Sequence, residues 1–223
     1  PENYIKIIDR SGFFEVTSFS DDDINRNAMY KANAQRVKVS KKFENYDDYL
    51  LSLEMTAEIE EFKSIDLQRI TQLTNKSNQF NLTTKRYTQN EIEKISSDGN
   101  YITLCGRLKD KFGDNGIVSV VIGRKENDAL HIDLWLMSCR VLKRNMEYAM
   151  LDCLVSEAKL EGIRKIYGYY LKTKKNSMVK SLFSDFGFEK ISEDIEENTV
   201  WEMDIKNYIP KNKLITVKQT QKV

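Results

Sequence analysis

The sequence predicts an α/β domain with a mixed sheet and flanking helices, preceded by a helical connector. The first observation is the order of the expected elements, because strands and helices follow one another without strict alternation. The second is a run of three closely spaced strands between residues 101 and 137, which indicates an antiparallel meander. The third is a strand that leads directly into a long amphipathic helix between residues 132 and 160. With 223 residues, the chain has room for one domain and a smaller appendage.

The first 53 residues are polar and predict a helical connector. Ser20 is suited to cap a helix N-terminus, and the acidic residues Asp21 to Asp23 that follow it complement the helix dipole. We expect this helix to end near Gln35 and a second short helix to lie between about residues 45 and 53.

The first half of the domain begins with a weakly alternating strand over residues 55–62 and continues with a helix over residues 64–77. The stretch 75–87 is unusually rich in amide and hydroxyl side chains. This composition is typical of an exposed loop, although it also suits contact with a polar ligand, and we favour the loop. Thr88 and Glu91 have the spacing of a capping box and predict the start of the next helix.

The second half of the domain contains the meander, the long helix and a closing pair of strands. Asp114, Asn115 and Gly116 tolerate left-handed backbone conformations and predict a hairpin turn. The expected elements are strands over residues 101–108, 117–123 and 130–137, a helix over 146–160, a strand over 165–171, a helix over 176–186, and strands over 188–191 and 199–205. We therefore expect a connector at 1–53, the domain at 54–208, and a basic tail at 209–223 that is mobile or packs last.

Composition and charge argue against several classes of function. Lys and Arg number 35 against 34 Asp and Glu, so no strong basic field points to nucleic acid. No apolar run approaches the length of a membrane span and no signal peptide is visible, so we expect no membrane partner. His131 is the only histidine, and the 3 cysteines lie far apart, with Cys105 and Cys153 at expected core positions. These features are typical of a cytoplasmic protein without a bound metal.

The best candidate site is the turn between the third meander strand and the long helix. A turn that leads from a strand into a helix N-terminus offers free backbone N–H groups and the positive end of the helix dipole, so it suits an anion. We expect any chemistry of this chain to occur there. The turn consists of Ser138, Cys139, Arg140, Val141, Leu142, Lys143, Arg144 and Asn145.

The order of elements, with FSDFGF near the end of the domain, resembles the GCN5-related N-acetyltransferase (GNAT) fold. In that family the turn has the pattern Q/R-x-x-G-x-G/A, and the next helix receives the phosphates of coenzyme A. Arg140 matches the first position, but Lys143 and Asn145 stand where glycines would let backbone amides approach phosphate. The family motif F-Y-x-x-L-G-F contains a tyrosine that protonates the leaving thiolate, and Phe183 occupies that position. The resemblance implies that Arg140, Val141, Leu142, Lys143, Arg144 and Asn145 bind coenzyme A or a phosphopantetheine arm.

Four longer stretches resemble the C-terminal region of FkbH-like proteins, subfamily IIIC of the haloacid dehalogenase superfamily. They are RITQLTNKSNQFNLTTKRYT, LKDKFGDNGIVSVVI, IDLWLMSCRVLKRNMEYAML and TKKNSMVKSLFSDFGF, which together span most of residues 68–188. The resemblance implies an acyltransferase-like domain that loads a glyceryl or related small hydroxyacyl unit onto the thiol of an acyl carrier protein, for polyketide biosynthesis. It also implies that the phosphorylated three-carbon donor is handled by an Asp-x-Asp phosphatase domain with its Mg²⁺, expected upstream of Pro1. No cofactor is expected to remain bound to this part of the protein.

Cys139 is the candidate nucleophile. It precedes three cationic side chains and a helix N-terminus, so we expect a lowered thiol pKa that favours the thiolate. If the strand continues regularly, Cys139 shares a face with Asp133, Trp135 and Met137. The alternative is that Cys139 is a small buried hydrophobe, as free cysteines commonly are, and the sequence leaves the two interpretations even.

The resemblance also implies a set of substrate-binding residues, because the region after the first helix of a GNAT domain shapes the acceptor side. Arg86 is the strongest of them, since its guanidinium can hold a carboxylate or phosphate with two hydrogen bonds. Composition alone allows the same residues to be turn residues that bond their own backbone. Two classes of function remain open: an acyltransferase, and a catalytically degenerate module that docks the carrier or scaffolds the phosphatase. The candidate substrate-binding residues are Asn78, Asn81, Thr83, Thr84, Arg86 and Asp133.

Overall fold

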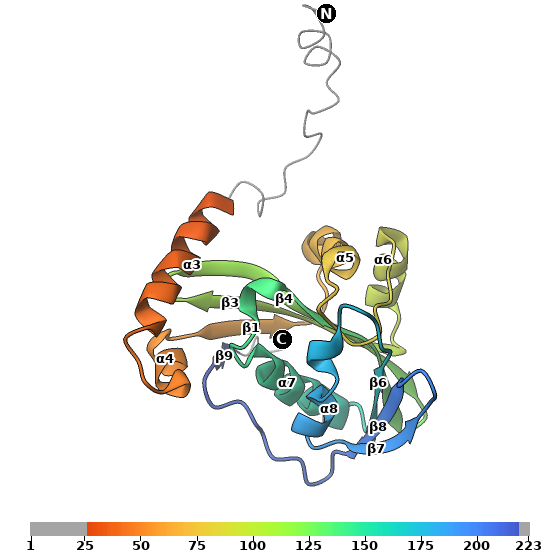
Figure 1. Cartoon of the computed structure of the whole chain (residues 1–223). Helices are drawn as coiled ribbons and strands as arrows, with labels where there is room; N and C mark the ends of the chain where they lie inside the picture. The colour runs from red at the N-terminus through yellow and green to blue at the C-terminus, as the bar shows by residue number, and fades with distance from the viewer. Residues whose placement is uncertain (1–25, 219–223) are drawn as a thin grey trace, which may run out of the picture.

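The computed structural model describes residues 26–218, and within this range the strands form one mixed sheet of 9 strands. The strand order is β7-β8-β6-β5-β4-β3-β1-β9, with β2 added beside β5 (Figure 1). The pairs β5–β6 and β1–β9 are parallel, and the other pairs are antiparallel. The predicted mixed α/β architecture is therefore confirmed.

The elements follow one another in a mixed order along the chain. The strands are β1 (Thr56–Glu60), β2 (Phe80–Asn81), β3 (Tyr101–Asp110), β4 (Gly113–Glu126), β5 (Ala129–Met137), β6 (Lys165–Tyr170), β7 (Glu189–Glu193), β8 (Thr199–Asp204) and β9 (Thr216–Lys218). The helices are α3 (Arg26–Ser40), α4 (Tyr46–Ser52), α5 (Leu67–Lys76), α6 (Gln89–Ser97), α7 (Met146–Leu160) and α8 (Leu182–Asp185), with short 3-10 helices η1 (Ser64–Asp66), η2 (Cys139–Val141) and η3 (Ser177–Val179).

Helices cover both faces of the sheet, with α7 and α8 on one face and α5 and α6 on the other (Figure 1). The larger core joins α7 to the strands, and Met146, Met150 and Leu154 are fully buried in it. The packing is close, because a Cβ atom on Gly106 of β3 would lie 2.4 Å from Met146 Cε and 2.6 Å from Met150 Sδ. The smaller core joins α5 and α6 to the opposite face of the sheet.

The helices before β1 are part of the same packed body. Asn45 caps α4, its side chain accepting a hydrogen bond from the Asp47 amide at 2.8 Å, as the predicted helix start requires. Leu50 and Leu53 are fully buried in the larger core. Residues of the predicted connector therefore share a core with the predicted domain at 54–208, and the boundary between the two stays a prediction. The predicted helix cap at Ser20 and Asp21 to Asp23 lies outside the described residues.

The segment Phe80–Leu82 fills the gap between β5 and β6. These two strands pair only over residues 129–131 and 165–167, after which they separate. β2 pairs with the end of β5, Leu82 N–H donates to the Trp135 carbonyl at 3.1 Å, and Leu171 N–H donates to the Leu82 carbonyl at 2.8 Å. The stretch 75–87 is therefore not a plain exposed loop, because its apolar side chains Phe80 and Leu82 are buried.

Further expectations need correction. The predicted hairpin turn at Asp114, Asn115 and Gly116 lies within β4, because β3 ends at Asp110 and β4 begins at Gly113. The predicted helix 176–186 is broken into η3 and α8. Residues 216–218 of the predicted tail pair with β1 as β9, next to the buried Ile215, so of the two alternatives this part of the tail fits packing onto the domain and not mobility. β5 is also irregular: a register shift between Ile122 and Gly123 places Leu134 in the smaller core, although Ile132, two residues earlier, lies in the larger one with Trp135. The capping box of Thr88 and Glu91 is confirmed. None of the helices within residues 26–218 is long and apolar enough to cross a membrane.

Candidate functional site

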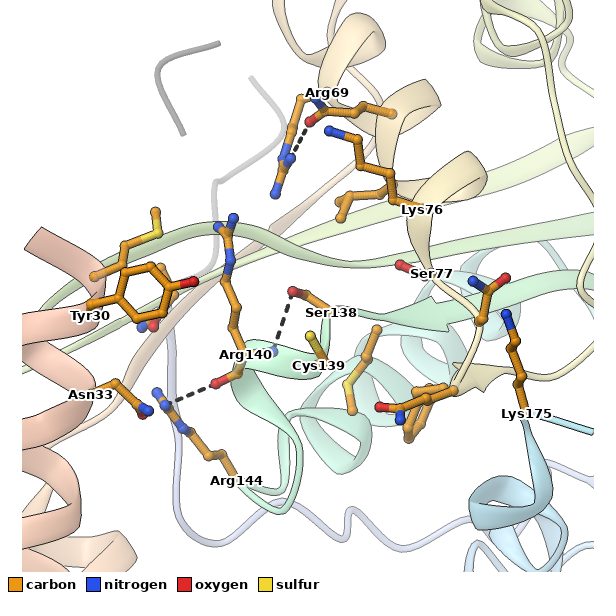
Figure 2. Close-up of a pocket in the computed structure, with 18 of the residues that line it drawn as sticks. Tyr30, Asn33, Arg69, Lys76, Ser77, Ser138, Cys139, Arg140, Arg144 and Lys175 are labelled. Atoms are coloured by element: carbon orange, nitrogen blue, oxygen red, sulfur yellow. Dashed lines mark hydrogen bonds between the residues drawn. The ribbon is translucent and has the colours of Figure 1, made fainter. Parts of the chain in front are cut away.

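A cavity of about 960 Å³ opens where the end of β5 meets α3 and α5. Its walls come from α3, from α5 and the residues after it, from the turn that begins at Ser138, and from the loop after β6 (Figure 2). None of the described residues that line it is acidic. The cavity is therefore a cationic space suited to an anionic ligand. Its basic lining residues are Arg36, Arg69, Lys76, Arg140, Arg144, Lys174 and Lys175.

Two of these cations, Arg36 and Arg144, share one buried carboxylate, which balances one of their two positive charges. Asp110, whose side chain is 0% exposed, accepts hydrogen bonds from Arg36 Nε and Nη2, both at 2.8 Å, and from Arg144 Nη1 at 3.1 Å. The Phe112 amide donates to the same carboxylate at 2.9 Å. Desolvation and the neighbouring Arg36 lower the pKa of Arg144, while Asp110 opposes that shift. This cluster ties α3, β3 and the turn together. The other basic residues of the lining are Arg69, Lys76, Arg140, Lys174 and Lys175.

The remaining cations approach the cavity from different walls. Figure 2 shows Arg140 rising from η2 between α3 and α5, toward Arg69, with Lys76 further along α5 and Lys175 on the other side. Tyr30 and Asn33 face the cavity from α3. Because separate elements contribute these charges, a bound anion would link the connector, the sheet and the loop after β6.

Cys139 lies in η2 on the cavity wall and is exposed. The expectation that it shares a strand face with Asp133 and Trp135 is wrong, because β5 ends at Met137 and the register shift separates those two side chains. Its location also rules out the buried alternative. The accessible thiol can meet a ligand in the cavity.

The other two cysteines differ from Cys139. Cys105 is buried in the smaller core, and Cys153 is half-buried against the larger one, as expected. Burial raises the pKa of the Cys105 thiol to about 12, with Asp66 adding to the shift. Burial also raises the pKa of the Cys153 thiol to about 11, with Asp152 adding to it. Both thiols are therefore protonated and shielded near neutral pH.

The turn itself keeps a left-handed backbone at the two positions where the GNAT pattern has glycine. Lys143 has φ 64° and Asn145 has φ 62°. The hydroxyl of Tyr46, from α4, donates to the Lys143 carbonyl at 2.9 Å and fixes this part of the turn. The backbone thus follows a glycine-like path, but Cβ atoms stand where a phosphate would need close access to amides. Neither Lys143 nor Asn145 lines the cavity.

The remaining predicted turn residues divide between the cavity and the core. Arg140 and Arg144 line the cavity. Val141 is fully buried, and Leu142 packs partly buried against the larger core. The turn therefore presents side-chain charge to the cavity rather than a continuous row of backbone amides.

A second, smaller cavity of about 340 Å³ adjoins the first and shares Asn78, Lys174 and Lys175 with it. It is also lined by Thr84, Thr173 and Arg86. Thr84 has φ 53°, a left-handed conformation that is uncommon for a β-branched residue. Arg86 donates to the carbonyls of Thr74 and Ser77 and to the Asn78 side chain, so much of its guanidinium is used to hold the end of α5.

The other predicted substrate residues have partners within the fold. Asn81 is fully buried, donates to the Ser77 carbonyl at 3.2 Å, and accepts from the Thr84 amide at 2.8 Å. Thr83 donates to the Asp133 carbonyl at 2.8 Å. The Asp133 carboxylate faces Lys85 at 3.1 Å, away from the cavity lining. The structure therefore brings Asn78, Cys139, Arg140 and Arg144 together in the first cavity, but not Asn81, Thr83 or Asp133.

Several cavity residues were not identified from the sequence. Arg69 and Lys76 lie on α5, Tyr30 and Asn33 on α3, and Lys174 and Lys175 in the loop after β6. The pair of lysines in TKKN, directly after a predicted strand, was the one local signal available. No local sequence pattern indicated that α3 forms a wall of the cavity, because the position of α3 depends on the ion pair between Arg36 and the distant Asp110.

No family model matches the chain, and no curated protein matches it in sequence. In structure it is similar to the ribosomal-protein-S18-alanine N-acetyltransferase from Escherichia coli, with a TM-score of 0.51 and 11% identity over 69% of this chain and 99% of that one. It is also similar to the spermidine/spermine N-acetyltransferase from Vibrio cholerae, with a TM-score of 0.52 and 13% identity over 70% and 96% of the two chains. The GNAT domain of S. lividans PAT gives a TM-score of 0.52 and 12% identity over 66% and 89%. The chain therefore has the GNAT acetyltransferase fold.

Proposed function

We propose that this chain is an acyltransferase domain in which an acyl group passes through Cys139 while cationic side chains hold an anionic carrier. The observation that carries the proposal is the exposed thiol on the wall of a cavity with seven basic side chains and no acidic one among its described lining residues. The GNAT fold supports acyl transfer as the class of reaction. Acyl-coenzyme A and an acylated phosphopantetheine arm on a carrier both combine a thioester with phosphate, and both suit this charge.

The proposed step is a thioester exchange. The Cys139 thiolate attacks the carbonyl carbon of the incoming thioester, a new carbon–sulfur bond forms, and the bond to the carrier sulfur breaks. The leaving thiolate takes up one proton, equal to the one that the Cys139 thiol gave up, and nothing is oxidised or reduced. Because one thioester replaces another, the step needs no strong general acid. This suits a chain in which Phe183 is fully buried and has no hydroxyl to donate.

The finer proposal concerns the acyl group and its acceptor. The resemblance to FkbH-like proteins supports a glyceryl or related small hydroxyacyl unit, loaded onto the thiol of an acyl carrier protein after an upstream phosphatase domain has acted on a phosphorylated three-carbon donor. The polar lining supports a hydroxylated acyl group, since Ser77, Asn78, Gln79 and Ser138 face the same cavity as Cys139.

Intact-mass spectrometry tests this proposal. The chain is incubated with glyceryl-phosphopantetheine, both free and on a carrier protein, and the expected result is one glyceryl adduct that maps to Cys139. Cys139→Ala should lose the adduct, whereas the matched control Cys153→Ala should keep it. An adduct of equal yield on Cys139→Ala, or no adduct on the wild-type chain, would show that the acyl group is not attached to Cys139.

A second candidate function is a binding module without chemistry of its own. Two observations favour it. The Cβ atoms of Lys143 and Asn145 restrict the approach of a phosphate to the amides of the turn. Residues 80–82 fill the gap between β5 and β6, so a ligand cannot enter between these two strands. Such a module would dock the carrier protein or scaffold the phosphatase. It predicts carrier binding, measured by calorimetry at low salt, with no covalent adduct on any cysteine.

A further inference from the structure

The loop after β6 holds two lysines that have no ion-pair partner among the described residues 26–218. Neither Lys174 nor Lys175 forms an ion pair with any residue in the described range 26–218, and both are exposed. Their neighbours behave differently, because Lys172 and Lys180 both pair with Glu197. Lys174 and Lys175 line both cavities at the point where the two meet. They are therefore placed to meet a ligand that spans the two spaces.

The backbone that carries these lysines is fixed by buried hydrogen bonds. Asn176, which is fully buried, donates to the carbonyls of Asn81 and Leu171, both at 2.9 Å, and accepts from the Thr173 amide at 2.8 Å. The Lys175 amide donates to Thr173 Oγ1 at 3.3 Å. A fixed loop backbone loses little conformational entropy when a ligand binds, so the positions from which the two lysines extend are set before binding.

The facing wall of the smaller cavity is equally well fixed. Arg86 holds the Asn78 side chain and the end of α5, and Asn81 accepts from the amide of Thr84. Asn78, Thr84 and Thr173 offer neutral hydrogen-bonding side chains, and none of the described lining residues is acidic. A ligand group that fits two ammonium groups and neutral hydrogen-bonding side chains is an anion with several acceptor oxygens. A phosphate group has this chemistry, whereas a cationic or apolar ligand group does not.

The structure assigns Lys174 and Lys175, with Thr84 and Thr173, as a binding site for the phosphate group of the ligand whose reactive end lies in the larger cavity beside Cys139. The site combines the loop after β6 with Thr84 from the segment after β2, and it is separate from the turn at residues 138–145. The assignment rests on the proposed acyl transfer, because that reaction requires an elongated ligand with a phosphate at some distance from its acyl group. A phosphopantetheine arm and a small phosphorylated donor share this phosphate chemistry.

Calorimetry with paired probes tests the site. The probes are 4′-phosphopantetheine against pantetheine, and glycerol 3-phosphate against glycerol, because each pair differs by the phosphate alone. The variant is K174A/K175A, in which no ion pair of the described fold is lost. Its control is K206A/K213A, which removes the same charge from exposed lysines that line neither cavity. Circular dichroism checks that both variants keep the wild-type melting temperature, and K174R/K175R tests rescue of the charge.

We expect the phosphorylated probe of at least one pair to bind K174A/K175A roughly tenfold more weakly than the wild-type chain, which corresponds to about 1.4 kcal/mol. Its partner without phosphate should bind both equally, the control should match wild type, and K174R/K175R should restore binding. If 4′-phosphopantetheine is the probe that binds more weakly, the phosphate belongs to a phosphopantetheine arm. If it is glycerol 3-phosphate, the phosphate belongs to a small phosphorylated donor. Equal binding of both phosphorylated probes to wild type and K174A/K175A would overturn the site.

This test is independent of the acyl-transfer proposal. If phosphate binding depends on the two lysines but no adduct forms on Cys139, the phosphate site stands and the transfer reaction is wrong. If Cys139 is acylated equally in wild type and K174A/K175A and binding is unchanged, the reaction stands and the phosphate site is wrong.

Discussion

Arg36 and Asp110, 74 residues apart in the chain, form a bidentate ion pair in which both donor–acceptor distances are 2.8 Å and the carboxylate is fully buried. The pair joins the connector helix α3 to the end of β3. Arg144 from the turn shares the same carboxylate at 3.1 Å. The wall that α3 gives to the cavity therefore depends on one acidic side chain outside the cavity lining.

Replacing this carboxylate should destabilise the fold strongly. Asp110→Ala leaves two buried guanidinium groups without their counter-charge, and we expect a loss of about 3–5 kcal/mol in the free energy of unfolding. The exposed pair of Asp114 and Lys109, at 3.4 Å, provides a control, since Asp114→Ala should cost no more than about 1 kcal/mol. Urea denaturation followed by circular dichroism measures both. Similar losses for the two variants would mean that the buried cluster does not hold α3.

Cysteine labelling should separate Cys139 from the other two thiols. At pH 8, iodoacetamide is expected to modify Cys139 first in the native chain, because its side chain is exposed while Cys105 and Cys153 are shielded. The raised pKa values, about 12 for Cys105 and about 11 for Cys153, leave very little thiolate at those positions. Peptide mapping after short exposure gives the order. Labelling of Cys153 as fast as Cys139 would contradict the burial described for α7.

Restoring the tyrosine of the GNAT motif should fail to restore a general acid. A Cβ atom on Gly168 would lie 2.4 Å from Cζ of Phe183, so the ring tip touches the β6 backbone and a hydroxyl has no room. We expect Phe183→Tyr to lose about 1–3 kcal/mol of stability through overpacking and burial of a polar group. Acetyl transfer from acetyl-coenzyme A to amines should not increase. The conservative variant Phe183→Leu, which also lacks the hydroxyl, is the control, and a gain of activity in Phe183→Tyr alone would reverse this conclusion.

Much of the fold could be predicted from the sequence because local signals agree with the final structure. The capping box at Thr88, the cap at Asn45 and the alternation along β1 each arise from neighbouring residues. The cavity could not be predicted in the same way. It depends on contacts between distant residues, such as Arg36 with Asp110, and Asn176 with the carbonyl of Asn81 across 95 positions. Cys139 was identified because a turn ahead of a helix is a local feature, whereas Lys174 and Lys175 become part of the site only through folding.

Glu147 should make stability depend on pH. Burial raises the pKa of this carboxyl, and its Oε2 atom is buried without a hydrogen-bond partner in the described part of the chain. The folded state then holds its proton more tightly than the unfolded state, whose pKa is about 4.3. Stability from this group is therefore greatest below that value and falls as pH rises toward the folded pKa. Glu147→Gln should be more stable than wild type at pH 8, with the difference shrinking at pH 4. Urea midpoints at the two pH values decide this, and a difference that grows on acidification would reverse the sign.

The left-handed turn makes a final prediction about Lys143. Its φ of 64° is strained for a residue with a Cβ atom, by about 1–2 kcal/mol, whereas glycine adopts it freely. Glycine also makes the unfolded chain more flexible, which costs about 0.5–1 kcal/mol. Lys143→Gly should therefore leave stability unchanged or raise it by up to about 1.5 kcal/mol. The matched control Lys213→Gly, at an exposed position without positive φ, should lower stability. Thermal unfolding compares them, and an equal loss in both variants would show that the Lys143 side chain stabilises the turn by more than its strained backbone costs.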